Sequence, residues 1–315
     1  MNYSVFDLHC DTAMKILETD IPGRLSENEG HVDFRRGLEL PGYAQFFAFC
    51  TYPGMPEAAG RPIPQVLKTA VEYFLQQLSE NQGRAVQARS AAEVERVAAA
   101  GKAATLLSLE GPAGIDFDEG RLEDLYQLGF RMTTLTWNEE NPLAGSHMTG
   151  GGLTERGKAY VRRAQALGML MDVSHLSEQA FWGLLDVTQG PIVASHSNSR
   201  SVCSVSRNLT DRQFQAICQT GGVVGLNLFT GFLGEEPVTL EAACNHILHW
   251  LELGGEKNVA LGGDLDGCDS LPLDFAGVED YPDLARALEV RGVPASVLKD
   301  LFWNNAMRVL QSCCT

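Results

Sequence analysis

Several features that define common protein classes are missing from this sequence. It has no stretch near the roughly 18 apolar residues that a membrane span needs, and its start lacks the basic and apolar segments of a secretory signal. Basic residues are scarce, since 24 Lys and Arg stand against 40 Asp and Glu for a formal net charge of −16. Nucleic acids and anionic membranes are themselves polyanions, so this charge disfavours both as partners. We therefore expect a cytoplasmic protein.

Motifs for nucleotide binding, serine catalysis and disulfide scaffolds are also absent. No G-x-G-x-x-G follows the first strand-like run, and the glycines at 150–152 lack the Lys-Ser/Thr of a phosphate-binding loop. Ser195 and Ser197 flank His196 without a G-x-S-x-G elbow, which argues against a serine nucleophile. The eight cysteines form no C-x-x-C pair. Neither a disulfide framework nor a closed structural zinc site is expected.

The sequence does contain a regular alternation of strand and helix patterns. Its 315 residues are 44% hydrophobic, and this length fits one α/β barrel. Strand-like runs rich in apolar and β-branched residues are predicted at 4–9, 44–51, 104–109, 131–136, 169–174, 191–195, 222–228 and 259–263. Helix signals lie between them, namely capping boxes at Ser90–Glu93 and Thr210–Gln213, N-caps at Thr154 and Thr239, and stops at Gly129 and Gly168.

Strand followed by helix, repeated eight times, predicts the α/β class with a parallel sheet. Eight such units suggest closure into a (β/α)8 TIM barrel, with residues 1–315 forming a single domain and the excess length in inserted βα loops. An open doubly wound sheet is the competing architecture.

Polar side chains gather where the predicted strands end, which is the face that carries the chemistry of such barrels. They are His9 and Asp11 after the first strand, Glu110 after the third, His175 and His196 after the fifth and sixth, and Asp264 after the eighth. His9 and Asp11 are two residues apart, so their side chains should project together while Cys10 turns away. Each motif alone has an ordinary explanation as a turn or a carbonyl-bonded histidine. Packing does not explain their joint placement, because unpaired buried charges are costly.

Three imidazoles mixed with carboxylates predict a binuclear site for Zn²⁺, Mn²⁺ or Co²⁺. Glu110 is the natural bridge because each of its oxygens can hold one metal. Asp264 then remains for proton transfer from a metal-bound water. Other histidines look structural: His31 sits in a charged loop, and His246 and His249 mark a solvated or partly buried helix face.

These segments resemble the membrane dipeptidase (renal dipeptidase, peptidase M19) family of metal-dependent dipeptidases, in a soluble bacterial-type form. The resemblance spans nearly the whole chain and is carried by residues 7–11, 109–111, 125–129 with Arg131, 172–175, 195–197, 206–208, 262–267 and 281–284. It implies two zinc ions per chain, one held by His9 and Asp11, the other by His175 and His196, with Glu110 bridging. It also implies that Asp264 handles the proton.

The resemblance further implies that Arg207 binds the free C-terminal carboxylate of a dipeptide, which a planar guanidinium can pair with bidentately. Without the resemblance, Arg207 would be interpreted as a surface or helix-capping residue. Family members are often homodimers, so a homodimer is expected here. The family's C-terminal lipid-anchor signal is missing.

One position departs from the family pattern. Mammalian-type members carry a histidine after the Leu-Thr run of the fourth strand, thought to steady the carbonyl oxygen of the substrate, whereas this chain has Trp137 and Asn138. Trp137 has an N–H donor but cannot titrate as imidazole does. His147 lies in the loop that follows and can reach the barrel mouth. Trp137, Asn138 or His147 supplies that contact, or the transition state relies on the metals.

The leading hypothesis is a zinc-dependent dipeptidase, a metallopeptidase that hydrolyses dipeptides with a hydroxide bridging the two metals. The resemblance suggests that a D-configured C-terminal residue is tolerated. The alternative is a binuclear amidohydrolase for another small amide, lactone or N-acyl amino acid, which removal of Arg207 would discriminate. A third hypothesis is a catalytically silent barrel that binds a metabolite or a partner protein.

Overall fold

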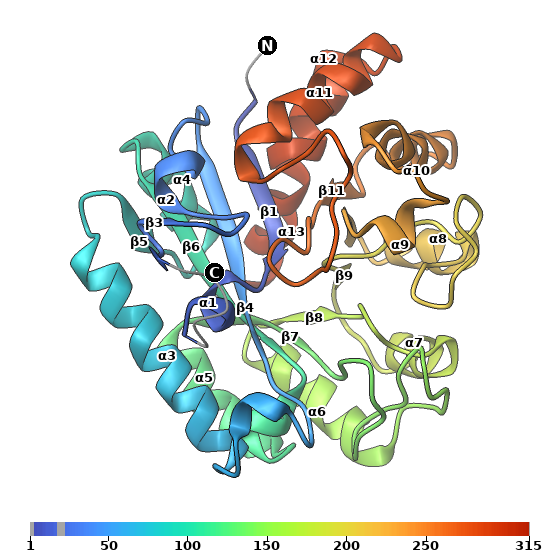
Figure 1. Cartoon of the computed structure of the whole chain (residues 1–315). Helices are drawn as coiled ribbons and strands as arrows, with labels where there is room; N and C mark the ends of the chain where they lie inside the picture. Colours follow the sequence, from blue (N-terminus) through green and yellow to red (C-terminus); the bar gives the residue numbers. More distant parts are fainter. Residues whose placement is uncertain (1–2, 18–22, 315) are drawn as a thin grey trace.

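The computed structural model of the chain describes residues 3–17 and 23–314 and contains a closed ring of eight parallel strands (Figure 1). In order around the ring these are β1 (Val5–Cys10), β4 (Tyr43–Cys50), β6 (Ala103–Glu110), β7 (Phe130–Thr134), β8 (Leu170–Asp172), β9 (Ile192–Ala194), β10 (Val223–Leu226) and β11 (Val259–Leu261). Asp7 of β1 pairs with Leu261 of β11, which closes the ring. The (β/α)8 barrel and all eight predicted strands are confirmed, with bounds shifted by at most two residues.

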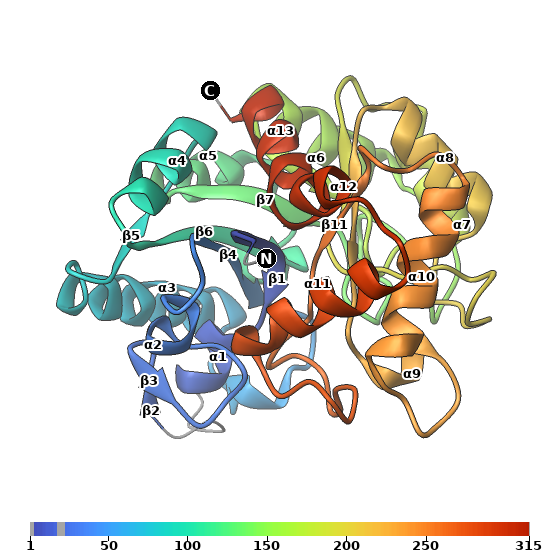
Figure 2. The ribbon, with the colours of Figure 1, turned by 90° about the horizontal axis from the view of Figure 1, so that it is seen from above.

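Helices lie outside the ring of strands, as the views in Figures 1 and 2 show. They are α1 (Thr12–Leu17), α2 (Phe34–Gly37), α3 (Ile63–Glu80), α4 (Ala91–Ala99), α5 (Leu122–Leu128), α6 (Glu155–Ala166), α7 (Glu178–Leu185), α8 (Asp211–Gln219), α9 (Thr230–Leu233), α10 (Leu240–Glu252), α11 (Tyr281–Val290), α12 (Ala295–Lys299) and α13 (Asn305–Cys313). Short additional strands, which the sequence pattern does not predict, are β2 (Gly23–Arg24), β3 (Glu27–Asn28) and β5 (Ala85–Gln87). Within residues 3–17 and 23–314, no helix is both long and apolar enough to cross a bilayer.

The helix starts follow the sequence signals, with two differences in detail. Thr210 and Gln213 form the predicted reciprocal capping box at the start of α8. Ser90 caps α4 by accepting the N–H of Glu93, but the Glu93 carboxylate accepts the N–H of Arg89 instead of that of Ser90. The box at α4 is therefore half formed. Helix boundaries are also observed near Thr154, Thr239, Gly129 and Gly168, although Thr239 makes no side-chain cap bond.

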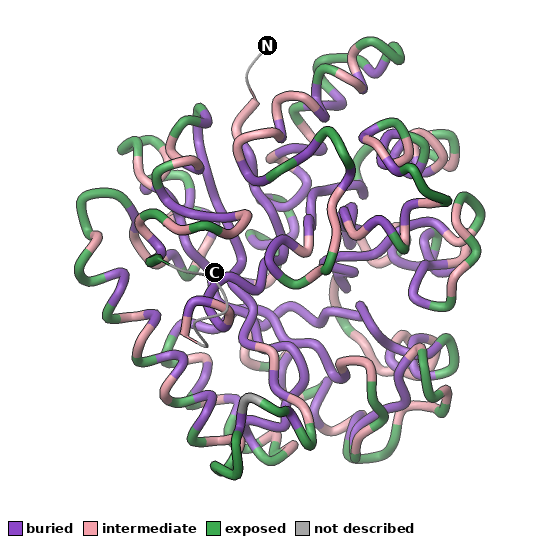
Figure 3. The backbone as a smooth tube through the Cα atoms, viewed as in Figure 1, coloured by how far each residue is buried: buried purple, intermediate pink, exposed green. Residues whose placement is uncertain are grey.

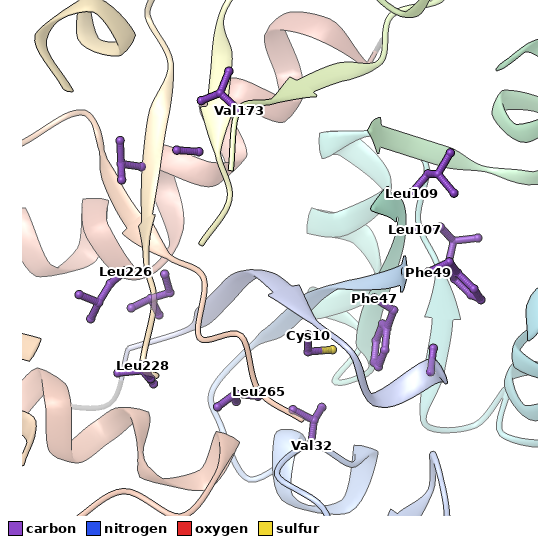
Figure 4. Packing of buried hydrophobic residues seen from close by; sticks show 14 of the residues in the cluster. Cys10, Val32, Phe47, Phe49, Leu107, Leu109, Val173, Leu226, Leu228 and Leu265 are labelled. Carbon is purple, nitrogen blue, oxygen red and sulfur yellow. The ribbon is translucent and has the colours of Figure 1, made fainter. Parts of the chain in front are cut away.

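Buried apolar side chains separate into a shell outside the strands and a cluster that fills the barrel. Figure 4 shows Phe47 and Phe49 of β4 beside Leu107 and Leu109 of β6, all in the outer shell. The ring of Phe74 from α3 lies 5.0 Å from Phe47 and 5.7 Å from Phe49. The strands are accordingly buried along their length, while exposed residues concentrate on the surrounding helices and loops (Figure 3).

Helix α13 closes the end of the barrel at which the strands begin. Its residues Met307 and Leu310 belong to the same buried cluster as Phe6 of β1. Asn305 donates to the carbonyl of Val259 at the start of β11 (2.8 Å), and the Cys314 thiol that follows the helix lies 3.2 Å from the carbonyl oxygen of residue 168, ahead of β8. The strand carboxyl ends therefore face the opposite side, where the predicted site residues lie.

Candidate metal centre

The carboxyl ends of five strands deliver the six predicted metal-site residues to one place. His9 lies in β1 with Asp11 directly after it, Glu110 is the last residue of β6, His175 and His196 follow β8 and β9, and Asp264 follows β11. Ligand atoms of His9, Glu110 and His196 lie within 4.8 Å of one another, as do those of His9, Asp11 and Asp264. Asp264 is partly exposed, and the others are buried.

Glu110 faces a different group with each of its oxygens. Oε1 lies 2.9 Å from His175 Nε2 and 3.5 Å from His196 Nε2. Oε2 lies 3.5 Å from His9 Nε2, which is itself 3.3 Å from Asp11 Oδ2. Glu110 therefore lies between the imidazoles of His175 and His196 and that of His9, and the His9 ring also stacks on that of His196 with ring centroids 3.7 Å apart.

The protonation of the His175 and His196 imidazoles indicates which kind of ligand these side chains can bind. Ser195 Oγ donates to Asp172 and lies 2.6 Å from His196 Nδ1, so Nδ1 of His196 carries the proton. Asn138 Oδ1, an acceptor, lies 2.9 Å from His175 Nδ1 and fixes the same tautomer there. The lone pairs on both Nε2 atoms consequently face Glu110. The Nε2 lone pairs and the Glu110 carboxylate are all electron-pair donors that face one another, and a cation between them would bind all three. The site therefore fits divalent metal ions.

His9 gives independent support for a cation. Among the residues that the structure describes, neither ring nitrogen of His9 has a hydrogen-bond partner, although the side chain is 1% exposed. Burial would lower the pKa of His9, but Glu110 and Asp11 raise it well above its usual range. The carboxylates therefore attract positive charge to His9, where a metal ion would supply it.

Burial shifts the pKa values of the His175 and His196 imidazoles and that of Asp264 in opposite directions. It lowers the pKa of His175 to about 3 and that of His196 well below its usual range, so both rings stay neutral. Burial raises the pKa of Asp264 to about 7, with a further contribution from Asp11 and Glu110. A carboxyl group that titrates near neutrality can both accept and release a proton.

Backbone strain is present in the loops that carry His175 and Asp264. His175, Asp264 and Asp266 have φ values of 68°, 56° and 65°, in the left-handed region that residues with a Cβ rarely adopt. Such strain persists where surrounding contacts hold it. Asp266 is held by a reciprocal pair in which its carboxylate accepts the N–H of His31 (2.6 Å) and its own N–H bonds His31 Nδ1 (3.0 Å). His31, predicted to be an ordinary loop residue, is part of this support.

A cavity of about 460 Å³ opens over the metal-site residues, within the range of small-molecule sites. Its wall includes Asp11, Glu110, Asp264 and His175, together with Met14, Tyr52, Met55, Trp137, Asn138, Phe229 and Phe232. The Trp137 ring stacks on Tyr52 with ring centroids 4.3 Å apart. Trp137, which stands where mammalian-type members carry histidine, therefore forms part of the cavity wall.

Arg207 is buried, so the interpretation as a surface residue is wrong. It is 4% exposed, its Nη1 donates to Ser197 Oγ (2.9 Å), and its guanidinium lies 5.7 Å from the Phe232 ring centroid. Within the described part of the chain, Nε and Nη2 have no hydrogen-bond partner. A buried cation with unused donors fits an anionic ligand.

The loop after β7 reaches the site through His147. Its Nε2 lies 3.0 Å from Asn138 Oδ1 and its Nδ1 lies 3.0 Å from Ser206 Oγ. The ring centroid is 6.0 Å from that of His175. Burial, together with the charge of Arg207, lowers the pKa of His147 to about 4. Both ring nitrogens are engaged, so His147 is a neutral member of the site's hydrogen-bond network.

Three buried polar residues that support the site were missed from the sequence. Asp7 accepts the backbone N–H of His9 (2.9 Å). Asp172 accepts both the backbone N–H of Ser195 (2.9 Å) and the Ser195 hydroxyl. Asn227 donates to Asp264 (2.9 Å). A signal was available, because Asp7, Asp172 and Asn227 each interrupt an apolar strand run. A lone polar residue in such a run must find partners when it is buried.

His246 contradicts its predicted place on a solvated or partly buried helix face. It is fully buried in α10, where Nδ1 accepts the N–H of Ser199 (3.0 Å) and Nε2 donates to the carbonyl of Leu233 (3.0 Å). The ring thereby holds the segment that follows His196.

Comparisons with known proteins identify the family to which the chain belongs. The family model described as membrane dipeptidase (peptidase family M19) matches residues 1–314. An uncharacterized protein of Klebsiella pneumoniae from the pqqA 5′ region is 35% identical over 266 residues, covering 80% of this chain and 97% of that protein. An uncharacterized dipeptidase of Schizosaccharomyces pombe is 34% identical over 219 residues, covering 66% of this chain and 53% of the relative, so the match spans about half of that protein.

Among solved structures, a metallo peptidase from Rhodobacter sphaeroides liganded with a phosphinate mimic of the dipeptide L-Ala-D-Ala superposes with a TM-score of 0.90. It is 27% identical and covers 99% of this chain and 100% of its own. The match of the family model to residues 1–314 shows that this chain belongs to the membrane dipeptidase family, peptidase family M19.

Proposed function

We propose that the protein is a zinc-dependent dipeptidase that hydrolyses the peptide bond of dipeptides. The observation that carries the proposal is the buried Glu110, whose two oxygens face separate metal-binding side chains. A metal-binding cavity, with the buried cation of Arg207 joined through Ser197 to the segment that follows His196, suits a small substrate that has both an amide and a carboxylate.

The proposed metal ligands are His9 and Asp11 for one ion, His175 and His196 for the other, and Glu110 for both. When bound, two such ions acidify a water molecule and polarise the amide carbonyl. Asp264 would take up the proton and pass it to the leaving amine, a role supported by its place 3.9 Å from His9 Nε2 and by its hydrogen bond from Asn227.

Arg207 binds the C-terminal carboxylate through Nε and Nη2, the donors left unpaired among the described residues. For the carbonyl oxygen of the substrate, Trp137, Asn138 and His147 remain the proposed candidates. Both ring nitrogens of His147 are engaged, which favours the indole N–H of Trp137 and the amide of Asn138 on the cavity wall.

We also propose that a D-configured C-terminal residue is accepted. The support comes from the Rhodobacter sphaeroides relative, whose bound phosphinate mimics L-Ala-D-Ala. A panel of L,L and L,D dipeptides measured by kcat/KM tests this, and loss of all activity on the L,D members would contradict it.

The central experiment separates metal binding from proton transfer. Asp264→Asn should keep both metals and lose about 10²- to 10⁴-fold in kcat, the range for removal of a general base, whereas Glu110→Ala should lose metal as well. Metal analysis of protein purified without chelator gives the stoichiometry, and fewer than one tightly bound divalent ion per chain would contradict the proposal. A fully active Asp264→Asn variant would remove Asp264 from its role.

The substrate class is tested at Arg207. A dipeptide whose C-terminal carboxylate is blocked as an amide should bind the native enzyme poorly, and Arg207→Met should remove the preference for the free acid. Equal kcat/KM for the free and blocked substrates would favour another small amide, a lactone or an N-acyl amino acid as substrate.

A further inference from the structure

The side chain of Asn138 joins two imidazoles at the edge of the cavity. Its Oδ1 lies 2.9 Å from His175 Nδ1 and 3.0 Å from His147 Nε2. An amide oxygen has two lone pairs and can accept from both rings at once. We propose that Asn138 is a positioning residue that holds His175 in its metal-binding tautomer, with His147 and Ser206 holding the Asn138 amide in turn. The inference rests on the proposed metal site.

The two ligands of this half of the site have different supports. His196 Nδ1 is held by Ser195, which donates to the buried carboxylate of Asp172. His175 Nδ1 has the neutral amide of Asn138 instead. A partner on the second ring nitrogen fixes the ring orientation and the tautomer of a metal-ligating histidine. Without Asn138, the proton of His175 is free to move to Nε2, where it would face Glu110 and exclude metal.

His175 needs this support more than an ordinary strand-end residue does. Its backbone is in the left-handed region, with φ of 68°, and it lies three residues beyond the end of β8. Backbone bonds tie it to the same loop, because His147 N donates to the carbonyl of His175 (2.7 Å). Ser146 Oγ donates to the backbone carbonyl of Asn138 (2.6 Å). One loop thus holds the His175 backbone and the residue that orients its ring.

The orientation of the Asn138 amide is itself determined by its neighbours. His147 Nδ1 pairs with Ser206 Oγ (3.0 Å). When the serine hydroxyl donates to Nδ1, the ring proton of His147 lies on Nε2 and points at Asn138 Oδ1. Ser206 directly precedes Arg207, so the network runs from the segment of the carboxylate anchor to a metal ligand.

The test measures metal affinity, which does not depend on turnover. Metal-free protein is titrated with Zn²⁺ in competition with a chromophoric chelator, and bound zinc is counted after dialysis. Asn138→Ala should bind the ion at His175 and His196 about 10- to 100-fold more weakly, so that one ion per chain is retained where the native protein keeps two. Glu139→Ala, an exposed neighbour, is the matched control and should stay within about twofold of the native protein.

A conservative variant distinguishes positioning from bulk packing. Asn138→Asp keeps an acceptor for His175 Nδ1 and should restore native or tighter zinc binding, because a carboxylate is a stronger partner for the ring proton. His147→Leu should give an intermediate loss by freeing the Asn138 amide. Native affinity in Asn138→Ala, or equal losses in Asn138→Ala and Asn138→Asp, would overturn the inference. Absence of zinc binding by the native protein would instead overturn the proposed function.

Discussion

Gly267 has no side chain at the point where two carboxylates of the candidate metal centre meet. A Cβ on this residue would lie 2.1 Å from Asp11 Oδ2 and 2.6 Å from Asp264 Oδ1. Contacts that short require one of the carboxylates to move. The glycine therefore preserves the positions of a proposed metal ligand and of the proposed proton carrier.

We predict that Gly267→Ala folds but binds zinc about tenfold or more weakly, because Asp11 must shift to admit the methyl group. Gly83→Ala is the control, since a Cβ there meets no atom within 4 Å, and its zinc affinity should not change. Isothermal titration of metal-free protein checks both variants. Native affinity in Gly267→Ala would show that Asp11 does not hold the ion.

His246 carries a pH-dependent contribution to stability. Burial, with a contribution from His249, lowers its pKa to about 4, whereas an exposed histidine in the unfolded chain titrates near 6.5. Below about pH 6.5, His246 binds a proton in the unfolded chain but stays neutral in the folded protein. Stability from the neutral ring is therefore complete above that pH and is lost as pH falls toward 4.

The expected size follows from the pKa difference. Between pH 7.5 and 5.0, the difference in unfolding free energy between the native protein and His246→Gln should shrink by about 2 kcal/mol. Both proteins are measured metal-free in denaturant titrations. Between pH 7.5 and 8.5 the difference should stay constant, because the ring is neutral in both states. A constant difference down to pH 5.0 would show that His246 accepts a proton in the folded protein.

Strand β1 shows what a pattern of alternation can and cannot predict. The spacing of His9 and Asp11 correctly places both side chains together, with Cys10 turned into the outer shell. Strict alternation from Phe6 and Leu8, which fill the barrel, would have placed Cys10 inside with them. The pairing with β4 shifts register between Asp7 and Cys10. Such a bulge depends on the neighbouring strand and leaves no local signal.

The ring strands were predictable because strands buried on both faces appear as apolar runs. The hairpin of β2 and β3 has two residues in each strand, too few to establish a period of two. His246 was misjudged for a related reason. Its helix is apolar on one face, but the burial of one polar ring is decided by partners at Ser199 and Leu233, which lie elsewhere in the chain.

Helix α13 stabilises the barrel from the end opposite the site. Leu310 is fully buried in the cluster that fills the barrel, and Gln311 beside it is exposed. Leu310→Ala should lower the unfolding free energy by about 2–5 kcal/mol, the cost of a cavity in a packed core. Gln311→Ala should change it by about 0.5 kcal/mol or less. Denaturant titration checks both, and equal stabilities would exclude α13 from the core.

The location of the site depends on the topology of the whole molecule. His9 and Asp264 are far apart in sequence, yet β1 and β11 are neighbours in the closed ring, and His9 Nε2 lies 3.9 Å from Asp264 Oδ1. Parallel strands bring every carboxyl end to one face, so the sequence order of strand-end residues predicts their meeting. The hydrogen-bond partners of Asp7, Asp172 and Asn227 could not be assigned in this way, because they are set by side-chain geometry.

Closure of the ring also concentrates negative charge. Asp11, Glu110 and Asp264 meet at His9 in a chain whose formal net charge is already −16. Without a counterion, these carboxylates repel one another, and burial adds to the cost of each charge. Metal ions that bind the folded centre and not the unfolded chain must therefore stabilise the fold.

Metal removal should accordingly lower the melting temperature of the native protein, and added Zn²⁺ should restore it. At a free metal concentration about 1,000 times the dissociation constant, each site contributes about 4 kcal/mol. Glu110→Ala is the control, because loss of the proposed bridging carboxylate should abolish most of the response to zinc. Thermal unfolding with and without chelator measures the difference, with metal content checked in each sample. An unchanged melting temperature in protein shown to have lost its metal would mean that the strand ends hold their arrangement without it. The predicted coupling between metal binding and barrel stability would then be wrong.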